Sequence, residues 1–376
     1  MKVVLAQDWI TDNGGGEKCL RAFLDLYPKS PILTLVWNEK KVSQFNETKI
    51  ITSFLNNYPL AKTKWRYYFS LMSRAVESLR VPKCDLVISN CYSSIKGLIT
   101  KPETLHICYC HTPTRYLWLP EIDERLSEGN FIKRSLASRL THDLRLWDFA
   151  AAQRPDLYVA NSKNAKKRIK KFYRRDSKVI YPPVEIDKFK VKEKKEIGDY
   201  FLFVSRLIPY KRADLVVAAF NQSGLPVKIV GDGPEKPRLK QMAKKNVEIL
   251  GRVDESKLIS LLSHCRAFIF PAEEDFGIAP VEAMASGRPV IAYAKGGALE
   301  TVVEGKTGLF FKDQTVDLLI SAIKKFEKFE PNFDSQEARK QAEKFSVQRY
   351  KREWQELISK SLLKFKNNDK INLNIQ

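Results

Sequence analysis

The sequence has few cysteines, no long apolar run and a shortage of acidic residues. Its six cysteines form no paired framework, which favours reduced thiols in a cytoplasm over a disulfide-stabilised secreted domain. No run approaches the roughly 18 apolar residues that a membrane-spanning helix needs. The first apolar run, residues 1–6, is too short for the core of a signal peptide. We therefore expect a cytoplasmic protein, soluble or peripheral at the inner face of the cell membrane.

The shortage of acidic residues leaves 44 acids against 65 bases, a formal charge of +21. Such a charge indicates an anionic partner, and the candidates are a nucleic acid, an anionic membrane surface and a phosphorylated small molecule. The basic residues are spread along the whole chain, and no recognition helix, aromatic RNA-binding motif or zinc spacing accompanies them. Nucleic-acid binding therefore stays the alternative from another class, and no nucleic acid is expected as partner.

Two phosphate-binding fingerprints are also missing. Gly231-Asp-Gly233 lacks the third glycine of a dinucleotide-binding motif. Gly305-Lys306-Thr307 resembles the end of a P-loop, but five positions before Gly305, where a P-loop needs glycine, the residue is Glu300. Both segments are predicted to be turns. The Cys108-Tyr-Cys110-His111 run has no second ligand cluster, so we interpret it as strand residues rather than a metal site.

Apolar runs of strand length alternate with helix-period stretches along the 376 residues. This alternation predicts an α/β fold with parallel sheets and helices on both faces, and the length favours two domains. Two adjacent prolines, Pro182 and Pro183, suggest a connector between them. The expected strands are residues 3–6, 32–36, 86–89, 105–108, 157–160 and 179–181, then 201–204, 227–230, 247–250, 267–270, 290–292 and 309–311.

The most informative segment is residues 271–285. An apolar run leads into acidic residues and a glycine, and Pro280 is then expected to open a short helix that ends at Gly287. The backbone N–H groups of Gly277, Ile278 and Ala279 would point off the N-terminus of this helix. Because those groups lack partners within a helix, they offer a site for an anionic oxygen.

Two glutamates flank this site. Glu274 precedes the glycine loop and Glu282 lies inside the helix. Glu282 is not explained by a capping box, because the position three residues earlier is Ala279 rather than Ser or Thr. A phosphate site between two carboxylates that can bind hydroxyls suits a sugar nucleotide.

Two further segments could contact a diphosphate. Gly14, Gly15 and Gly16 follow the first strand and precede a helix. We interpret them as a backbone loop for a diphosphate rather than a flexible turn, because three glycines cost folding entropy that a turn would not require. Arg206 and Lys211 follow the first strand of the second half. At a carboxyl end of a parallel sheet they are better interpreted as phosphate ligands than as a solvated basic turn.

Two more features favour function and structure about equally. His111 ends the strand of residues 105–110, at a carboxyl end where ligands of such sheets bind. Residues 62–80 combine an apolar stripe at helical spacing with five flanking cations. The stripe could be core packing, or it could lie at an anionic lipid surface.

These residues together resemble the GT-B glycosyltransferases of family 4, over essentially the whole chain. The matching segments are Gly14-Gly-Gly-Glu17, Cys110-His-Thr-Pro113, Tyr181-Pro-Pro-Val184, Ser205-Arg206 with Lys211, Gly231-Asp-Gly-Pro234, and Glu274 with Glu282 eight positions later. The string from His111 to Trp118 is most similar to the mannosyltransferase branch that builds surface polysaccharides.

The resemblance implies two Rossmann-like domains facing across a cleft, with a C-terminal helix crossing back to the first. The domains would be residues 1–183 on the acceptor side and 184–344 for the nucleotide sugar, with the returning helix in 345–376.

It also implies roles for individual residues. Glu274 would bind the donor sugar and Glu282 the ribose, while Arg206 and Lys211 would neutralise the diphosphate. His111 would line the sugar and acceptor side. Val253, with Gly251 and Arg252, would meet the base.

The resemblance further implies retention of anomeric configuration without a metal or other cofactor. Two cations and two helix N-termini can stabilise a leaving nucleoside diphosphate. No second carboxylate is clearly placed as a nucleophile, so double displacement is not supported. We therefore expect a glycosyltransferase that moves mannose from GDP-mannose to a lipid-linked or polysaccharide acceptor. A UDP-sugar is the alternative donor, because nothing in the sequence identifies the base.

Overall fold

The computed structural model describes residues 1–119 and 131–367, with residues 131–138 described by their backbone alone. The chain divides into two compact units. Unit 1 contains Met1–Pro183 together with Tyr350–Gln376, and unit 2 contains Val184–Arg349. Each unit is built on its own parallel sheet.

Unit 1 has a seven-stranded sheet in which every pair of neighbours is parallel. The order is β3-β2-β1-β4-β5-β6-β7. Strands β1 to β3 follow one another toward one edge and β4 to β7 toward the other, so the order in which strands are added reverses between β1 and β4. Its strands are β1 Val3–Ile10, β2 Ile32–Trp37, β3 Ile50–Thr52, β4 Leu86–Cys91, β5 Leu105–Cys110, β6 Leu157–Ala160 and β7 Ser177–Val179.

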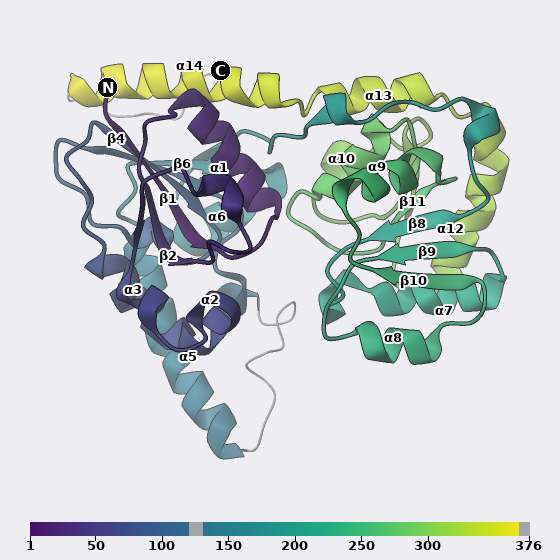
Figure 1. Ribbon diagram of the computed structural model, residues 1–376, viewed down its shortest axis with the longest axis horizontal. Helices are drawn as coiled ribbons and strands as arrows, with labels where there is room; N and C mark the ends of the chain where they lie inside the picture. Colours follow the sequence, from purple (N-terminus) through teal and green to yellow (C-terminus); the bar gives the residue numbers. More distant parts are fainter. Residues whose placement is uncertain (120–130, 368–376) are drawn as a thin grey trace. The chain divides into compact units, whose positions relative to one another are not determined.

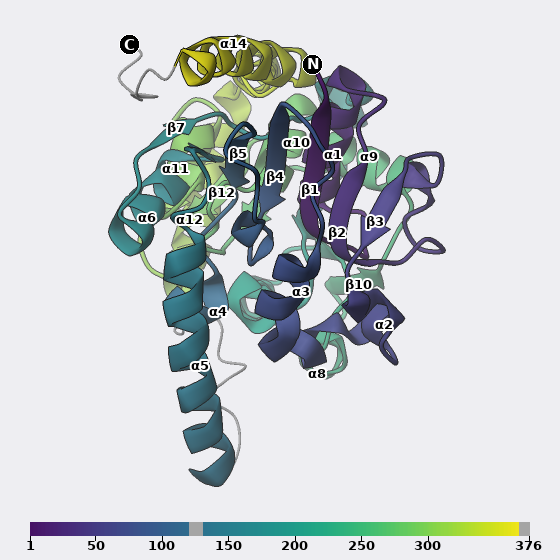
Figure 2. The same cartoon turned by 90° about the vertical axis from the view of Figure 1, so that its left-hand side faces the viewer.

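Helices cover both faces of this sheet (Figures 1 and 2). One core cluster joins the sheet to α1 and α14, and the other joins it to α3 and α6. The helices of unit 1 are α1 Gly15–Leu26, α2 Ala61–Lys64, α3 Met72–Ser78, α4 Arg115–Trp118, α5 Phe131–Ala151, α6 Lys163–Tyr173 and α14 Val347–Lys366.

Unit 2 has a six-stranded parallel sheet of order β10-β9-β8-β11-β12-β13, whose reversal lies between β8 and β11. Its strands are β8 Phe201–Val204, β9 Val227–Val230, β10 Val247–Gly251, β11 Phe268–Phe270, β12 Val290–Tyr293 and β13 Gly308–Phe311. Its helices are α7 Ala213–Ser223, α8 Lys236–Met242, α9 Glu255–His264, α10 Ile278–Ala285, α11 Ala298–Thr301, α12 Val316–Phe329 and α13 Ser335–Glu343. Two Rossmann-like units with parallel sheets confirm the expected fold class.

Helix α14 lies along unit 1 next to α1 in Figure 1. Its apolar side recurs at helical spacing, and the fully buried Trp354 ring lies edge-on to Phe23, with ring centroids 4.8 Å apart. Tyr350, Leu357 and Ile358 join the same core cluster. The returning helix was expected from residue 345. In the structure α14 begins at Val347, and unit 2 extends to Arg349. Within the described residues, no helix combines the length and apolarity that crossing a bilayer requires.

Candidate active site

The predicted site residues of unit 2 lie in loops that follow strands at one edge of its sheet. Arg206 follows β8, Val253 follows β10, and Glu274 follows β11. Because all six strands are parallel, their carboxyl ends meet at this edge, and β8 and β11 are the two strands at the reversal. This is the place where doubly wound sheets bind their ligands.

Lys211 and Glu274 form an ion pair at this edge, although 63 positions separate them in the chain. Both side chains are 14% exposed, so the pair is largely shielded from water. Lys211 ends a short 3₁₀ helix, Pro209–Lys211, directly before α7. The Arg206 side chain, by contrast, is exposed. The structure therefore places a cation and the proposed sugar-binding carboxylate in direct contact.

Helix α10 begins at Ile278, with Gly277 as its N-cap in a positive-φ conformation (φ 86°). The expectation that Pro280 occupies the first helical position was wrong, because Pro280 is the third helical residue. A proline is tolerated there because the N–H groups of the first turn have no intrahelical partners. Gly277, Ile278 and Ala279 thus lie at the helix N-terminus as expected, while Glu282 is buried in the helix.

The Gly231-Asp-Gly233 segment, which was predicted to be a turn, allows two loops of this edge to come into contact. A Cβ on Gly231 would lie 1.8 Å from the Ser205 carbonyl oxygen, and one on Gly233 would lie 2.3 Å from that of Leu207. The Leu207 N–H donates to the Asp232 carbonyl at 2.9 Å. The Gly231–Gly233 loop therefore supports the loop that carries Arg206.

A second glycine pair, which the sequence analysis did not identify, supports the Glu274 loop. A Cβ on Gly296 would lie 2.2 Å from the Glu274 carbonyl oxygen, and one on Gly297 would lie equally close to that of Phe276. The Gly297 N–H also donates to the Glu274 carbonyl at 2.8 Å. The repeated glycines after β12 were the available sequence signal.

In unit 1 the glycine loop after β1 leads into α1. Steric contacts explain why glycine occupies two of its positions. A Cβ on Gly16 would lie 2.7 Å from the ring of Tyr92, and one on Gly14 would lie 3.2 Å from the Glu17 carboxylate. The Gly14 N–H donates to Glu17 Oε2 at 3.0 Å. Gly15 and Gly16 open the helix. Close packing at this edge thus explains two of the three glycines without a ligand.

His111 follows β5 at the carboxyl edge of the same sheet, and both ring nitrogens have polar neighbours. Its Nε2 is 2.6 Å from Asn90 Oδ1, and its Nδ1 is 3.5 Å from Asn161 Nδ2. Asn90 lies on β4 and Asn161 follows β6. The sequence analysis missed both asparagines. Asn90 had a visible signal, because it is a polar residue next to Ser89 near the end of a strand that begins with an apolar run.

The loop after β4 is bound by a buried aspartate from β1. Asp8 accepts four backbone N–H bonds, from Tyr92 and Ser93 on one oxygen and from Ser94 and Ile95 on the other, at 2.7 to 3.0 Å. Complete burial raises the pKa of Asp8, and the N–H donors partly offset this effect. A carboxylate that spans β1 and the loop after β4 fixes the backbone at the reversal of the sheet.

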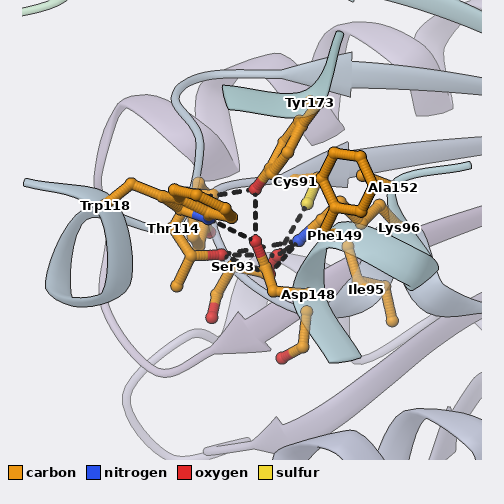
Figure 3. A network of polar contacts seen from close by, with 12 residues as sticks. Cys91, Ser93, Ile95, Lys96, Thr114, Trp118, Asp148, Phe149, Ala152 and Tyr173 are labelled. Atoms are coloured by element: carbon orange, nitrogen blue, oxygen red, sulfur yellow. Dashed lines mark hydrogen bonds and ion pairs between the residues drawn. The ribbon is translucent and has the colours of Figure 1, made fainter. Parts of the chain in front are cut away.

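A second buried carboxylate holds the segment that follows His111 (Figure 3). Asp148 of α5 accepts from Lys96 Nζ and Thr114 Oγ1 on one oxygen. Its other oxygen accepts from Trp118 Nε1 and the Tyr173 hydroxyl, both at 2.8 Å. Lys96 and Asp148 are at most 1% exposed. Burial alone would lower the pKa of Lys96, but the Asp148 charge, together with smaller contributions from neighbouring groups and the hydrogen bond to Asp148, raises it overall.

Two further expectations can be compared with the structure. Most of the apolar stripe in residues 62–80 faces the core: Trp65, Met72, Val76 and Leu79 are buried, so they form no lipid-facing surface. The stripe is also not one helix, because a 3₁₀ segment separates α2 from α3.

The cysteine run before His111 follows strand alternation, as predicted. Cys108 and Cys110 lie on one face of the sheet, and Tyr109 lies on the other. Within residues 1–119 and 131–367 no group of three metal-binding side chains occurs.

The two parallel sheets match the GT-B fold of solved glycosyltransferase structures. The chain superposes on Anabaena HepE in complex with UDP with a TM-score of 0.68 at 20% identity, over 96% of this chain and 100% of that one. With sucrose-phosphate synthase from Thermosynechococcus elongatus the TM-score is 0.73 at 14% identity, over 96% and 99%.

The sequence comparison identifies a matching family model. Residues 184–347, which lie in unit 2, match the family model for glycosyl transferases group 1. A GDP-mannose-dependent monoacylated alpha-(1-6)-phosphatidylinositol monomannoside mannosyltransferase of Corynebacterium glutamicum is 36% identical over 31% of this chain and 34% of the relative. The O-antigen chain mannosyltransferase C of Escherichia coli is 32% identical over 39% and 41%. D-rhamnosyltransferase WbpZ of Pseudomonas aeruginosa is 29% identical over 47% and 48%. The chain thus matches less than half of the length of each.

Proposed function

We propose that the protein is a retaining, metal-independent glycosyltransferase that transfers mannose from GDP-mannose to a lipid-linked or polysaccharide acceptor. The observation that carries this proposal is the Lys211–Glu274 pair at the reversal of the unit 2 sheet. The Glu274 loop also leads directly to the N-terminus of α10. A cation, a carboxylate and a helix N-terminus in one edge suit a phosphorylated sugar.

The chemistry follows from charge. As the glycosidic bond breaks, negative charge develops on the leaving nucleoside diphosphate. Lys211, Arg206 and the N–H groups at the start of α10 would stabilise that charge in place of a metal ion. Glu274, held beside Lys211, would accept hydrogen bonds from hydroxyls of the transferred sugar. Glu282 would do the same for the ribose, and Val253 would contact the base.

The donor is argued from the relatives. The Corynebacterium and Escherichia coli relatives are named as mannosyltransferases, and the first is named as GDP-mannose-dependent. A UDP-sugar is the second candidate, because HepE was solved with UDP and with UDP-glucose. His111 and the edge of unit 1 would bind the acceptor. We infer a lipid-linked acceptor from the phosphatidylinositol monomannoside in the name of the Corynebacterium relative.

The decisive experiment is a panel of GDP- and UDP-sugars tested for thermal stabilisation and for hydrolysis or transfer. We expect GDP-mannose to give the largest shift and the fastest turnover. Glu274→Ala should remove transfer while leaving the unfolding midpoint within a few degrees, and Glu337→Ala, an exposed acid on α13, is the matched control. Wild-type turnover in Glu274→Ala would exclude the assigned role, and a preference for UDP-sugars would select the second donor.

A further inference from the structure

A chain of side-chain hydrogen bonds joins the glycine loop of unit 1 to His111. It runs from Glu17 on α1 to Gln7 on β1, then to Asn90 on β4, and ends at the imidazole. The successive distances are 3.0, 2.6 and 2.6 Å. Gln7, Glu17 and Asn90 are buried, and Gln7 and Asn90 are register partners across the reversal between β1 and β4.

The direction of every bond in this chain can be derived. Gln7 Nε2 contacts the Trp9 carbonyl at 3.1 Å, which can only accept, and Glu17 Oε1 at 3.0 Å. The atom facing them must therefore be the amide nitrogen. The Gln7 oxygen then accepts from Asn90 Nδ2, which also donates to the Gly16 carbonyl at 2.9 Å.

Asn90 has thereby used both of its N–H groups, and its carbonyl oxygen faces His111 Nε2. A carbonyl oxygen accepts and cannot donate, so Nε2 carries the proton. In a neutral imidazole the other nitrogen, Nδ1, is then the acceptor. Asn161 agrees from the opposite side: Ser162 Oγ donates to its oxygen at 3.2 Å, so its amide nitrogen is the atom 3.5 Å from Nδ1.

We propose that Asn90, supported by Gln7 and Glu17, is a positioning residue that holds His111 as its neutral Nε2–H tautomer. Nδ1 is consequently the nitrogen that accepts, and a hydroxyl of the sugar acceptor would bind there in place of the 3.5 Å contact with Asn161 Nδ2. Nε2 is excluded as a general base, because its lone pair is replaced by the N–H bond. The last step, contact with a sugar hydroxyl, rests on the proposed function, whereas the tautomer does not.

The test is ¹⁵N NMR of histidine-labelled full-length protein, with the His111 signals identified by their loss in His111→Gln. We expect a protonated Nε2 and an unprotonated Nδ1 in the wild type near neutral pH. Asn90→Leu removes the acceptor and should weaken the preference for Nε2–H, because only the 3.5 Å contact of Asn161 Nδ2 with Nδ1 then supports it. Asn90→Asp keeps an acceptor and adds a charge, so it should raise the pKa of His111 and stabilise the doubly protonated ring.

Glu17→Gln tests the far end of the chain. Its side chain offers one oxygen to two donors, the Gly14 N–H and Gln7 Nε2, so one of the two bonds must be lost. We expect a weaker Nε2–H preference, between wild type and Asn90→Leu, while Glu356→Gln on the exposed side of α14 leaves the spectrum unchanged.

An Nδ1–H tautomer in the wild type would overturn the proposal, and that spectrum needs no variant to fold. An unchanged tautomer in folded Asn90→Leu would overturn it too. Kinetics separate this outcome from the proposed function. Asn90→Leu should lower kcat by on the order of 10- to 100-fold, with the donor KM nearly unchanged. A changed tautomer with undiminished kcat would confirm the positioning and remove His111 from the reaction.

Discussion

At the scale of single residues, three buried carboxylates of unit 1 have hydrogen-bond donors on both oxygens. Asp8, Glu17 and Asp148 are each at most 6% exposed, and each accepts hydrogen bonds on both oxygens. Burial of a charge is costly unless its lone pairs are satisfied. All three bind parts of the sheet edge that carries His111, so charge burial serves to fix that edge.

Removing Asp148 alone should lower the free energy of unfolding more than removing Asp148 together with Lys96. Asp148→Leu leaves the Lys96 ammonium buried without its carboxylate, and we expect a loss of about 3–5 kcal/mol in the free energy of unfolding. The double variant Lys96→Met with Asp148→Leu removes both charges and should recover part of this loss, while Thr114, Trp118 and Tyr173 still lack the Asp148 acceptor. Urea unfolding measures all three proteins. A single variant that costs less than about 1 kcal/mol would contradict the importance of the pair.

Glu17 predicts a pH-dependent stability. Burial raises its pKa to about 7 from an ordinary value of 4.5, with a further increase from the nearby charge of Asp12 and opposing hydrogen bonds from Gly14 and Gln7. Between these two pH values the folded state binds more protons than the unfolded state, so stability falls as pH rises through this window. Glu17→Gln removes this titration. The unfolding midpoint of the wild type minus that of Glu17→Gln should therefore decrease from pH 4.5 to pH 7.5.

A constant difference would show that Glu17 titrates normally. The neighbouring titratable groups, Asp8 and Tyr92 among them, are present in both proteins, so their contributions cancel in the difference.

At the scale of elements, close backbone contacts position the loops of unit 2. Gly233→Ala should displace the Arg206 loop, because the new Cβ would lie 2.3 Å from the Leu207 carbonyl oxygen. We expect the donor KM to rise on the order of 10-fold, since small misplacements of binding groups weaken binding strongly. Gly305→Ala is the control: its φ of 71° is unsuited to alanine, but no atom lies within 4 Å of the added Cβ, so it tests backbone strain without steric contact. It should lower stability and leave KM unchanged.

Most elements could be predicted from the sequence, because strands buried on both faces form apolar runs. Strand β3 was missed because three residues carry too little pattern. Strand β1 was predicted to end at Ala6 but continues to Ile10, because Gln7 and Asp8 interrupt the apolar run without interrupting the hydrogen-bond ladder.

The same two residues show why the site was only partly predictable. The motif residues Lys211 and Glu274 could be named from spacing, and the structure brings them into contact. Gln7, Asp8 and Asn90 belong to no motif, and their meaning depends on which strands are neighbours. Strand order is a tertiary property, so the hydrogen-bond chain to His111 could not be derived from the sequence alone.

At the scale of the whole molecule, the charge of +21 raises the question of an anionic membrane. Residues 62–80 were a candidate surface, and the structure changes how they could act. Their buried apolar stripe is unavailable for insertion, while Lys64 and Arg66 are exposed beside the exposed ring of Tyr67. Association would then be electrostatic, with about 1 kcal/mol from each cation near the surface.

Co-sedimentation with vesicles tests this interpretation. We expect binding to vesicles that contain anionic lipid, no binding to zwitterionic vesicles, and release as salt shortens the Debye length. Lys64→Glu with Arg66→Glu should weaken binding more than Lys166→Glu with Lys167→Glu, an equal change of charge on the exposed face of α6. Equal weakening would assign the association to total charge rather than to this surface. Salt-resistant binding would instead require apolar insertion, which the buried positions of Trp65, Met72 and Val76 do not provide.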